Sequence, residues 1–88
     1  MPKVEVYCTK FCPYCVRAKM LLDKKNVAYE EIRVDQDTAR REEMIERSKR
    51  TSVPQIFIDD YHVGGCDDIH ALDAQGKLDG LLVGAGNP

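Results

Sequence analysis

Two cysteines separated by two residues are the pattern best able to carry chemistry in this chain. They lie in the stretch Cys12-Pro13-Tyr14-Cys15, where the spacing brings both thiols within one turn of a helix. Cysteine pairs of this kind carry out thiol–disulfide exchange or bind a metal ion. Zinc would need a second ligand pair, and no zinc-finger spacing is found among the other candidates, Cys8, Cys66, His62 and His70. Redox chemistry is the favoured interpretation, with half of a zinc site as the alternative.

The two cysteines are expected to have different roles. Pro13 suits the first turn of a helix, so Cys12 is expected at the helix N-terminus, where unpaired N–H groups and the helix dipole stabilise an anion. A thiol in that position can have its pKa lowered from about 8.5 to about 3.5–7.5. Cys15 lies deeper in the helix and gains less. We therefore predict that Cys12 attacks and Cys15 resolves, with Lys10 adding positive charge nearby.

Two further motifs each allow two interpretations. Val53-Pro54 precedes a predicted strand, so the proline either marks the start of that strand or forms a cis peptide bond. Gly64-Gly65-Cys66-Asp67-Asp68 connects a strand to a helix. Its glycines either relieve a tight turn, with Asp67 as the helix N-cap, or let a ligand carboxylate reach free N–H groups while an acidic side chain meets an ammonium. The residues alone leave both alternatives open.

The remaining polar and sulfur-containing side chains are expected to have structural roles. Cys8 ends a predicted strand and is expected to be a small, inert core residue. His62 and His70 are expected to face solvent, and Tyr14 to offer an exposed flat contact. A solvated helix face is predicted for the basic residues interleaved with glutamates, which are Arg40, Arg41, Arg47, Lys49 and Arg50.

The elements that must position these residues are short. Alternating apolar and polar residues predict strands over 3–7, 28–34, 55–58 and 61–64, the last two joined as a hairpin at Asp59-Asp60. Helical periodicity predicts helices from 12 to about 26, over 38–48 and over 67–75. The order β-α-β-α-β-β-α predicts an α/β fold, in which helices flank a mixed four-stranded sheet of two parallel strands and an antiparallel hairpin.

Composition limits the class of protein. The chain has 88 residues, of which 43% are hydrophobic and 32% charged, with a net charge of −2, so one soluble globular domain is expected. This charge gives no support to a nucleic-acid or membrane-surface protein. An acidic residue, Glu5, interrupts the position of a signal-peptide core, so a reducing cytoplasm is the expected compartment. Residues 84–88 are expected to form a flexible tail.

Together, Cys12-Pro13-Tyr14-Cys15, Thr51-Ser52-Val53-Pro54 and Gly64-Gly65-Cys66-Asp67-Asp68 resemble the motifs of a dithiol glutaredoxin of the small bacterial type. The likeness extends from about residue 4 to residue 82 and includes the stretches 41–44 and 54–59. It implies a thioredoxin-like fold and a single glutaredoxin domain over residues 1–83.

The resemblance also implies the reaction and its residues. An enzyme of this family reduces protein disulfides and protein–glutathione mixed disulfides, with glutathione as cosubstrate and no bound cofactor or metal. By position, Cys12 would be the nucleophile and Cys15 the resolving thiol. Val53 would offer its backbone to the cysteinyl part of glutathione, with Pro54 in cis. The γ-glutamyl end would meet backbone N–H groups and the Asp67 carboxylate. The full set of implied glutathione contacts is Tyr14, Val53, Pro54, Gly65, Cys66, Asp67 and Asp68.

One position departs from the family pattern. Many relatives carry a lysine three residues before the nucleophile, where it helps to bind the glutathione carboxylate and to stabilise the thiolate. This chain has Thr9 at that position and Lys10 one residue later. Whether Lys10 replaces the usual lysine depends on the direction of its side chain.

A monomer with glutathione and disulfide-containing or glutathionylated proteins as partners is expected, without nucleic acid or membrane partners. Two alternatives are kept. One is an iron–sulfur carrier, a dimer bridged through Cys12 and glutathione, against which Pro13 argues by resemblance. The other is a glutaredoxin-like protein that thioredoxin reductase recycles.

Overall fold

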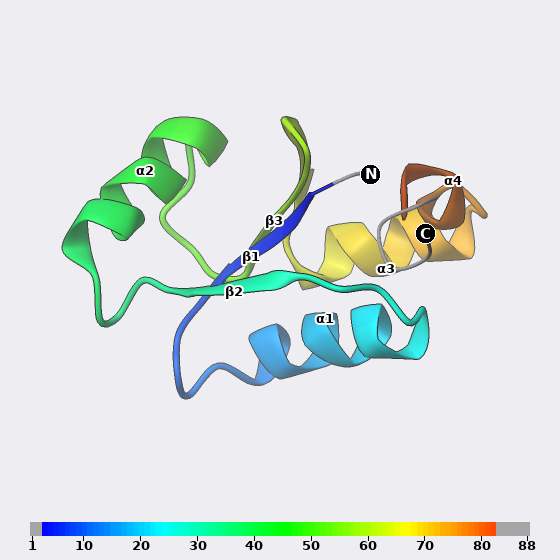
Figure 1. Ribbon diagram of the computed structural model, residues 1–88, viewed down its shortest axis with the longest axis horizontal. Coiled ribbons are helices and arrows are strands. Elements are labelled where there is room, and N and C mark those ends of the chain that lie inside the picture. Colours follow the sequence, from blue (N-terminus) through cyan, green and yellow to red (C-terminus); the bar gives the residue numbers. More distant parts are fainter. Residues whose placement is uncertain (1–2, 83–88) are drawn as a thin grey trace.

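The computed structural model describes residues 3–82 and contains one four-stranded sheet with helices on both faces (Figure 1). The strands are β1 (Val4–Cys8), β2 (Glu30–Arg33), β3 (Gln55–Ile58) and β4 (Tyr61–Gly64). The helices are α1 (Pro13–Lys24), α2 (Thr38–Ser48), α3 (Cys66–Ala74) and α4 (Leu78–Leu82). The strand order is β2-β1-β3-β4, with β1 parallel to β2 and antiparallel to β3, and β3 antiparallel to β4. The predicted α/β fold with a mixed sheet is confirmed.

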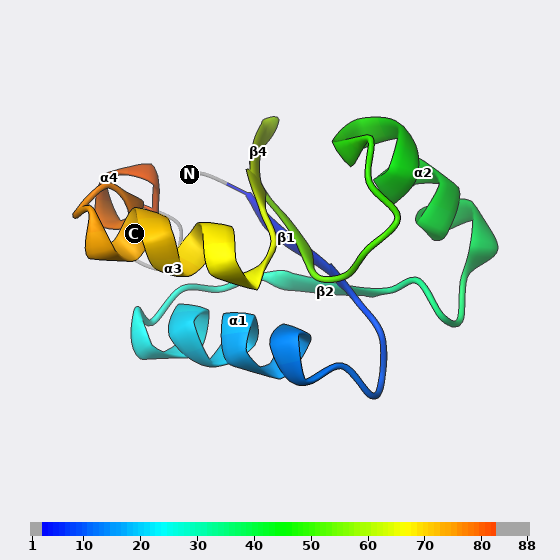
Figure 2. The same cartoon turned by 180° about the vertical axis from the view of Figure 1, so that it is seen from behind.

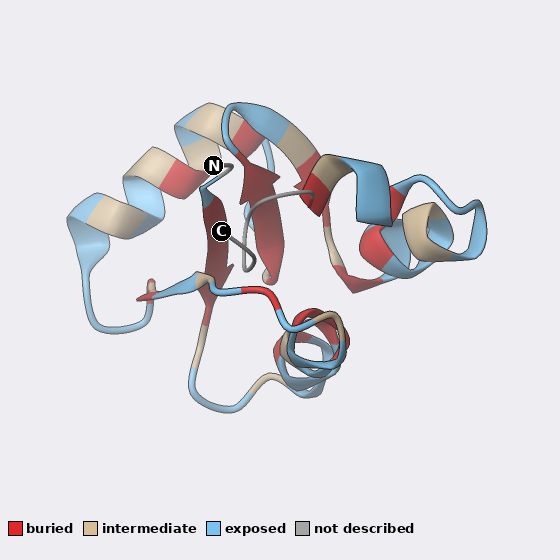
Figure 3. Ribbon diagram, turned by 45° about the vertical axis from the view of Figure 1, so that its right-hand side comes forward, coloured by how far each residue is buried: buried red, intermediate tan, exposed pale blue. Residues whose placement is uncertain are grey.

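Alternation along β1 divides the interior into two clusters. Val4, Val6 and Cys8 pack on the face covered by α1, α3 and α4, whereas Tyr7 packs on the opposite face, beneath α2. All five residues of β1 are buried, because strands pair with it on both edges and helices cover both faces. Figure 3 shows this distribution, with a buried sheet interior and exposed outer helix surfaces. The hydrophobic contact between these layers is the main source of stability in such a fold.

The ends of α1 and α2 follow local chemistry. Cys12 is the N-cap of α1, with extended backbone angles (φ −125°, ψ 105°), and Pro13 follows at the first helical position. Asn26, expected to stop this helix, adopts a left-handed conformation (φ 57°) just after it. Asp37 caps α2 by accepting a hydrogen bond from the Arg40 N–H group at 3.2 Å. These caps satisfy N–H groups that a helix N-terminus leaves free.

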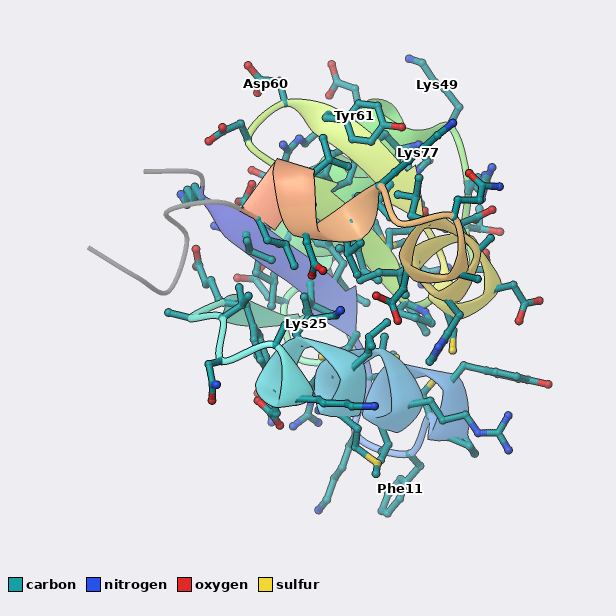
Figure 4. All side chains as sticks on the ribbon, turned by 90° about the vertical axis from the view of Figure 1, so that its right-hand side faces the viewer. Phe11, Lys25, Lys49, Asp60, Tyr61 and Lys77 are labelled. Carbon is teal, nitrogen blue, oxygen red and sulfur yellow. The ribbon has the colours of Figure 1, made fainter. Side chains whose placement is uncertain are left out.

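The short helix α4 was not expected from the sequence. Its stretch of five residues is too short for helical periodicity to show, but Leu78 and Leu82 bury their side chains against the core. Lys25, at the end of α1, binds the carboxylates of Asp73 in α3 (2.7 Å) and Asp79 in α4 (3.0 Å). This three-way ion pair holds the C-terminal helices beside α1, and Figure 4 labels Lys25 at that junction. The predicted tail over residues 84–88 lies outside the described residues.

A polar network fastens α2 to the sheet, where a solvated helix face was expected. Arg47 donates to the Glu5 carboxylate at 3.0 Å and to the Tyr7 hydroxyl at 2.8 Å, and its guanidinium lies 4.0 Å from the Phe57 ring centroid. The Tyr7 hydroxyl in turn donates to Glu43 at 2.6 Å. The expectation for Arg47 is therefore wrong, because its planar guanidinium both stacks on a ring and neutralises a buried carboxylate.

His62 also differs from its expected exposed position. Its ring stacks on Phe57 with 4.8 Å between ring centroids, and its Nε2 atom lies 2.7 Å from the Gln55 Oε1 atom. Burial lowers the pKa of His62. His70, in contrast, is exposed on α3, as expected.

The Arg47 network leads to a stability prediction. Replacing this residue in Arg47→Met leaves the Glu5 carboxylate, whose side chain is only 10% exposed, without its closest cation. We expect the free energy of unfolding to fall by about 2 kcal/mol, measured by urea denaturation. The matched control is Arg41→Met, an exposed position on the same helix, which is expected to change it by less than about 0.5 kcal/mol. Equal losses in the two variants would show that the network contributes nothing specific.

Candidate active site

Cys12 stands at the N-terminus of α1 with its sulfur partly exposed. The Cys15 N–H group donates to the Cys12 sulfur at 3.3 Å, and the Cys12 thiol donates to the Val53 carbonyl at 3.7 Å. The first contact is that of an N-cap side chain with the first turn of its helix. The second joins the helix to the loop before β3. The thiol is thus held between two elements that lie 41 residues apart in the chain.

Cys15 lies beneath Cys12 and has no exposed surface. It belongs to the same buried cluster as Cys8, and Cys12 packs against that cluster from its partly exposed position. Cys8 is fully buried at the end of β1, which confirms its expected place in the core. The interior of the site therefore contains three neighbouring thiols, of which only Cys12 reaches the surface.

The thiol protonation states correct one expectation. Burial and the Cys15 thiol raise the pKa of Cys12, while the N–H groups of Cys15 and Tyr14 lower it, and the raising effects are the larger. The low pKa expected for Cys12 is therefore wrong for this arrangement. The cause is that the Cys12 thiol is partly buried and lies beside the Cys15 thiol, and both effects disfavour the thiolate. Hydrogen bonding to the Cys8 thiol and burial raise the pKa of Cys15 much further, so Cys15 holds its proton more firmly than Cys12 does.

A buried glutamine secures the loop that faces Cys12. The Val53–Pro54 peptide bond is cis, as the family resemblance implied. Next to it, the side chain of Gln55 has no exposed surface and donates to the Ser52 carbonyl at 3.0 Å, while its oxygen meets His62. Nothing in the sequence marks Gln55 as a residue of the site, because a glutamine that starts a strand gives no signal of burial. The hydrogen bonds of Gln55 fix the loop that carries the Val53 carbonyl.

The start of α3 forms the opposite wall of the site. The N-cap is Gly65, and the Asp68 carboxylate accepts from the Gly65 N–H group at 2.9 Å, which excludes the alternative in which Asp67 is the N-cap. Gly64 has φ of +112°, and a Cβ atom on it would lie 2.2 Å from the Asp68 carboxylate, so this position requires glycine. Capping by Asp68 leaves the Asp67 carboxylate exposed to solvent. The Cys66 and Asp67 N–H groups lie in the first turn, where no intrahelical acceptor is available.

These elements enclose a cleft of about 180 Å³. It gathers all seven residues for which the resemblance implied glutathione contacts. Arg50 also reaches it and binds the Asp68 carboxylate at 3.2 Å, a role that its place in a charged stretch did not reveal. The residues that line the cleft are Tyr14, Arg50, Ser52, Val53, Pro54, Gln55, Gly65, Cys66, Asp67 and Asp68.

Thr9 and Lys10 lie outside this group. The Lys10 ammonium is 5.3 Å from the centroid of the Phe11 ring, and the backbone N–H group of Lys10 donates to the Asp35 carboxylate at 3.3 Å. Phe11 itself is 87% exposed and points away from the body of the molecule below α1 (Figure 4). The Lys10 side chain therefore lies beside the Phe11 ring and does not line the cleft.

Two structural findings concern other classes of site. Within residues 3–82, no group of three or more His, Cys, Asp or Glu side chains is placed to hold a metal ion. Of the helices described, none has the length and hydropathy needed to cross a bilayer.

Paired thiols at a helix N-terminus are suited to thiol–disulfide exchange. On a mixed four-stranded sheet, they place the protein among the thiol–disulfide oxidoreductases with a thioredoxin-like fold. The glutaredoxin family model matches residues 4–63. The chain belongs to the glutaredoxin family, whose members are glutathione-dependent thiol oxidoreductases.

Similar proteins support this assignment over nearly the full chain. Glutaredoxin 3 of Escherichia coli (strain K12) is 60% identical over 82 residues, which cover 93% of this chain and 99% of the relative. A glutaredoxin of Pseudomonas aeruginosa is 52% identical, covering 93% and 98% of the two chains. The crystal structure of the buckwheat glutaredoxin–glutathione complex has a TM-score of 0.87 at 31% identity, covering 97% of this chain and 80% of that one. The solution structure of a Brucella melitensis glutaredoxin has a TM-score of 0.82 at 51% identity, covering 93% and 89%.

The protonation order leads to a labelling prediction. A limiting amount of iodoacetamide at pH 7 is expected to modify Cys12 well before Cys15, because Cys12 is more exposed and its pKa is raised less. Fragment spectra of the tryptic peptide 11–17, which contains both cysteines, report the order. Equal or faster labelling of Cys15 would contradict it.

Proposed function

We propose that the chain reduces protein–glutathione mixed disulfides and protein disulfides, with glutathione as the electron donor. The carrying observation is that the Cys12 thiol donates to the carbonyl of Val53, and that Val53 lines one cleft together with the first turn of α3. Glutathione has a thiol, peptide groups, and an α-carboxylate beside an ammonium. Each of these groups has a chemically matching partner along the cleft.

The reaction with a mixed disulfide uses only one enzyme thiol. The Cys12 thiolate attacks the glutathione sulfur, a bond forms between these two sulfurs, and the target protein leaves as a thiolate. A second glutathione then attacks its own moiety on Cys12, which releases oxidised glutathione and restores the Cys12 thiolate. A substrate backbone that binds the Val53 carbonyl would take the acceptor that the Cys12 proton now has. Substrate binding would thereby favour the attacking form.

The reaction with a protein disulfide also needs Cys15. After Cys12 forms a mixed disulfide with the target, the Cys15 sulfur attacks the Cys12 sulfur and the reduced target leaves. The product is a Cys12–Cys15 disulfide, which two glutathione molecules reduce in turn. The Cys15 N–H group lies 3.3 Å from the Cys12 sulfur within one helical turn, and Cys15 is buried while Cys12 is partly exposed, which supports this division of roles.

The γ-glutamyl end of glutathione is assigned to the start of α3. Its carboxylate would accept from the free N–H groups of Cys66 and Asp67, and its ammonium would meet the Asp67 carboxylate. Asp68 supports this wall through Gly65 and Arg50. Thr9 occupies the position of the family lysine, and Lys10 follows it. Because Lys10 lies beside Phe11, it would contact glutathione only at the rim of the site.

The partners and compartment complete the proposal. We place a monomer in the cytoplasm, where reduced glutathione is available to recycle Cys12. Disulfide-containing and glutathionylated proteins would approach from the side of Tyr14 and Phe11, whose rings are 55% and 87% exposed beside the nucleophile.

Variants of the two cysteines test the division of roles. Cys12→Ser is expected to abolish reduction of both substrate classes, because Cys12 is the nucleophile, Cys15 has no exposed surface and Cys66 is only 6% exposed. Cys15→Ser is expected to keep the reduction of a glutathione mixed disulfide, which needs one enzyme thiol, and to lose reduction of a protein disulfide. Both rates are measured with glutathione and glutathione reductase as the coupled reductant. Equal loss of both activities in Cys15→Ser would overturn the assignment, and faster recycling by thioredoxin reductase would overturn the choice of donor.

A charge variant tests the glutathione site. Asp67→Asn is expected to raise the KM for glutathione about two- to tenfold, the usual effect of losing a partly solvated charge partner. Reduction by dithiothreitol, which has no γ-glutamyl group, should change little. The matched control is Asp60→Asn at the exposed hairpin, which should leave both reductants unaffected. If Asp67→Asn affects glutathione and dithiothreitol equally, or neither, Asp67 does not bind the γ-glutamyl end.

A further inference from the structure

His62 is a residue to which the proposed reaction assigns no role. It lies in β4 at a shift of register: Phe57 pairs with His62 and Ile56 pairs with Gly64, so β4 has one extra residue, Val63, at this step. Because of this bulge, the His62 ring shares a face of the sheet with Phe57, on which it stacks with 4.8 Å between ring centroids. The histidine is therefore directed toward the cluster beneath α2, to which Phe57 belongs.

The same face of β3 carries Gln55, two residues before Phe57. The Gln55 side chain has no exposed surface. Its amide nitrogen donates to the Ser52 carbonyl at 3.0 Å and to the Ser52 hydroxyl at 3.3 Å, and its oxygen lies 2.7 Å from the His62 Nε2 atom. A carbonyl oxygen accepts and never donates, so the Ser52 carbonyl fixes the nitrogen of the amide on its own side and the amide oxygen on the side of His62. His62 must therefore present an N–H group at Nε2.

This series of hydrogen bonds ends beside the nucleophile. Ser52 directly precedes Val53, whose carbonyl accepts from the Cys12 thiol at 3.7 Å. Ser52, Val53 and Gln55 line the cleft, whereas His62 does not. Without the His62 donor, the buried Gln55 oxygen would lose its partner, and an unsatisfied buried acceptor is costly enough to turn the amide away from Ser52.

We propose that His62 is a positioning residue for the reaction, which holds the Val53 backbone in place for the glutathione half of a mixed disulfide by fixing the Gln55 amide on Ser52. His62 touches neither the substrate nor Cys12, and it acts through Gln55 and Ser52. This inference rests on the proposed function, in which the Val53 backbone binds glutathione. Its consequence is that His62 affects the recognition of glutathione and not the chemistry of the thiols.

Two substitutions at position 62 separate the N–H donor from the ring. His62→Phe keeps an aromatic ring on Phe57 and removes the donor, whereas His62→Gln places an amide nitrogen close to the position of Nε2. With the mixed disulfide of cysteine and glutathione as substrate, His62→Phe is expected to raise KM about three- to tenfold and to change kcat less than about twofold, because a buried acceptor has lost its donor. His62→Gln is expected to keep KM within about twofold of the wild-type value.

Controls detect a general loss of structure. His70→Phe, at an exposed histidine of α3, should leave both constants unchanged, and dithiothreitol should reduce the oxidised form of every variant at the wild-type rate. An unchanged KM in His62→Phe, equal losses in His62→Phe and His62→Gln, or a parallel loss with dithiothreitol would overturn the inference and leave the proposed function intact. A wild-type chain that does not turn over the glutathione mixed disulfide would overturn both.

A double variant tests the route through Gln55. Gln55→Met removes the buried amide and is expected to raise KM by itself. Adding His62→Phe to Gln55→Met should raise KM no further, because members of one hydrogen-bonded series are not additive. Effects that multiply in the double variant would overturn the inference.

Nuclear magnetic resonance tests the donor in the unaltered chain. Burial lowers the pKa of His62, so its ring is neutral at pH 8. The Nε2 nitrogen should carry the proton there and give an observable N–H resonance, because the hydrogen bond to Gln55 slows exchange with water. A ring with its proton on Nδ1 would overturn the inference without any substitution.

Discussion

The antiparallel pairing of β1 with β3 at the centre of the sheet is the constraint on which the site depends. In this pairing Tyr7 lies opposite Gln55, so the last residues of β1 and the first residue of β3 meet at the same end of the strands. β4 runs antiparallel to β3, and Gly64, its last residue, lies opposite Ile56 at this same end of the strands. The segments that follow β1, precede β3 and follow β4 therefore converge there. These segments carry the dithiol, the Val53–Pro54 bond and the start of α3, as the view from behind shows for β4 and α3 (Figure 2).

The same strand separates two kinds of interior. On the side of α1 and α3 the sheet presents aliphatic side chains and Cys8, which lies in the same buried cluster as Cys15. On the side of α2 it presents Tyr7 and Glu5, which need polar partners and find them in Arg47. The period of two in β1 thus decides that the thiols gather on one face and the charged network on the other. A shift of one residue in register would exchange these contents.

Within the site, local helix chemistry and burial act against each other on the nucleophile. The N–H groups at the start of α1 favour the Cys12 thiolate, whereas burial and the neighbouring thiol favour the protonated form. For Cys15 the protonated form is favoured more strongly, because the Cys8 thiol and burial raise its pKa and it has no exposed surface. The two cysteines of one motif are therefore distinguished by depth. This difference supports an attacking and a resolving role in terms of access and protonation.

The amino-acid sequence by itself determined the order of the first seven elements, the approximate positions of all four strands, and the motifs that form the site. Short-range rules suffice for these features, because alternation, proline, glycine and the cysteine spacing act within a few residues. Only the tertiary structure decided the partners of side chains that lie far apart. The sequence predicted solvent-exposed side chains for Arg47 and His62. In the structure Arg47 binds Glu5 and Tyr7, and His62 binds Gln55. The N-cap of α3 is Gly65 and not Asp67, because the Asp68 carboxylate accepts from the Gly65 N–H group. The helix α4 depends on burial of two leucines, and the place of Cys8 and Cys15 in one buried cluster depends on how α1 packs on β1. These outcomes follow from three-dimensional packing, which brings together residues that no local pattern relates.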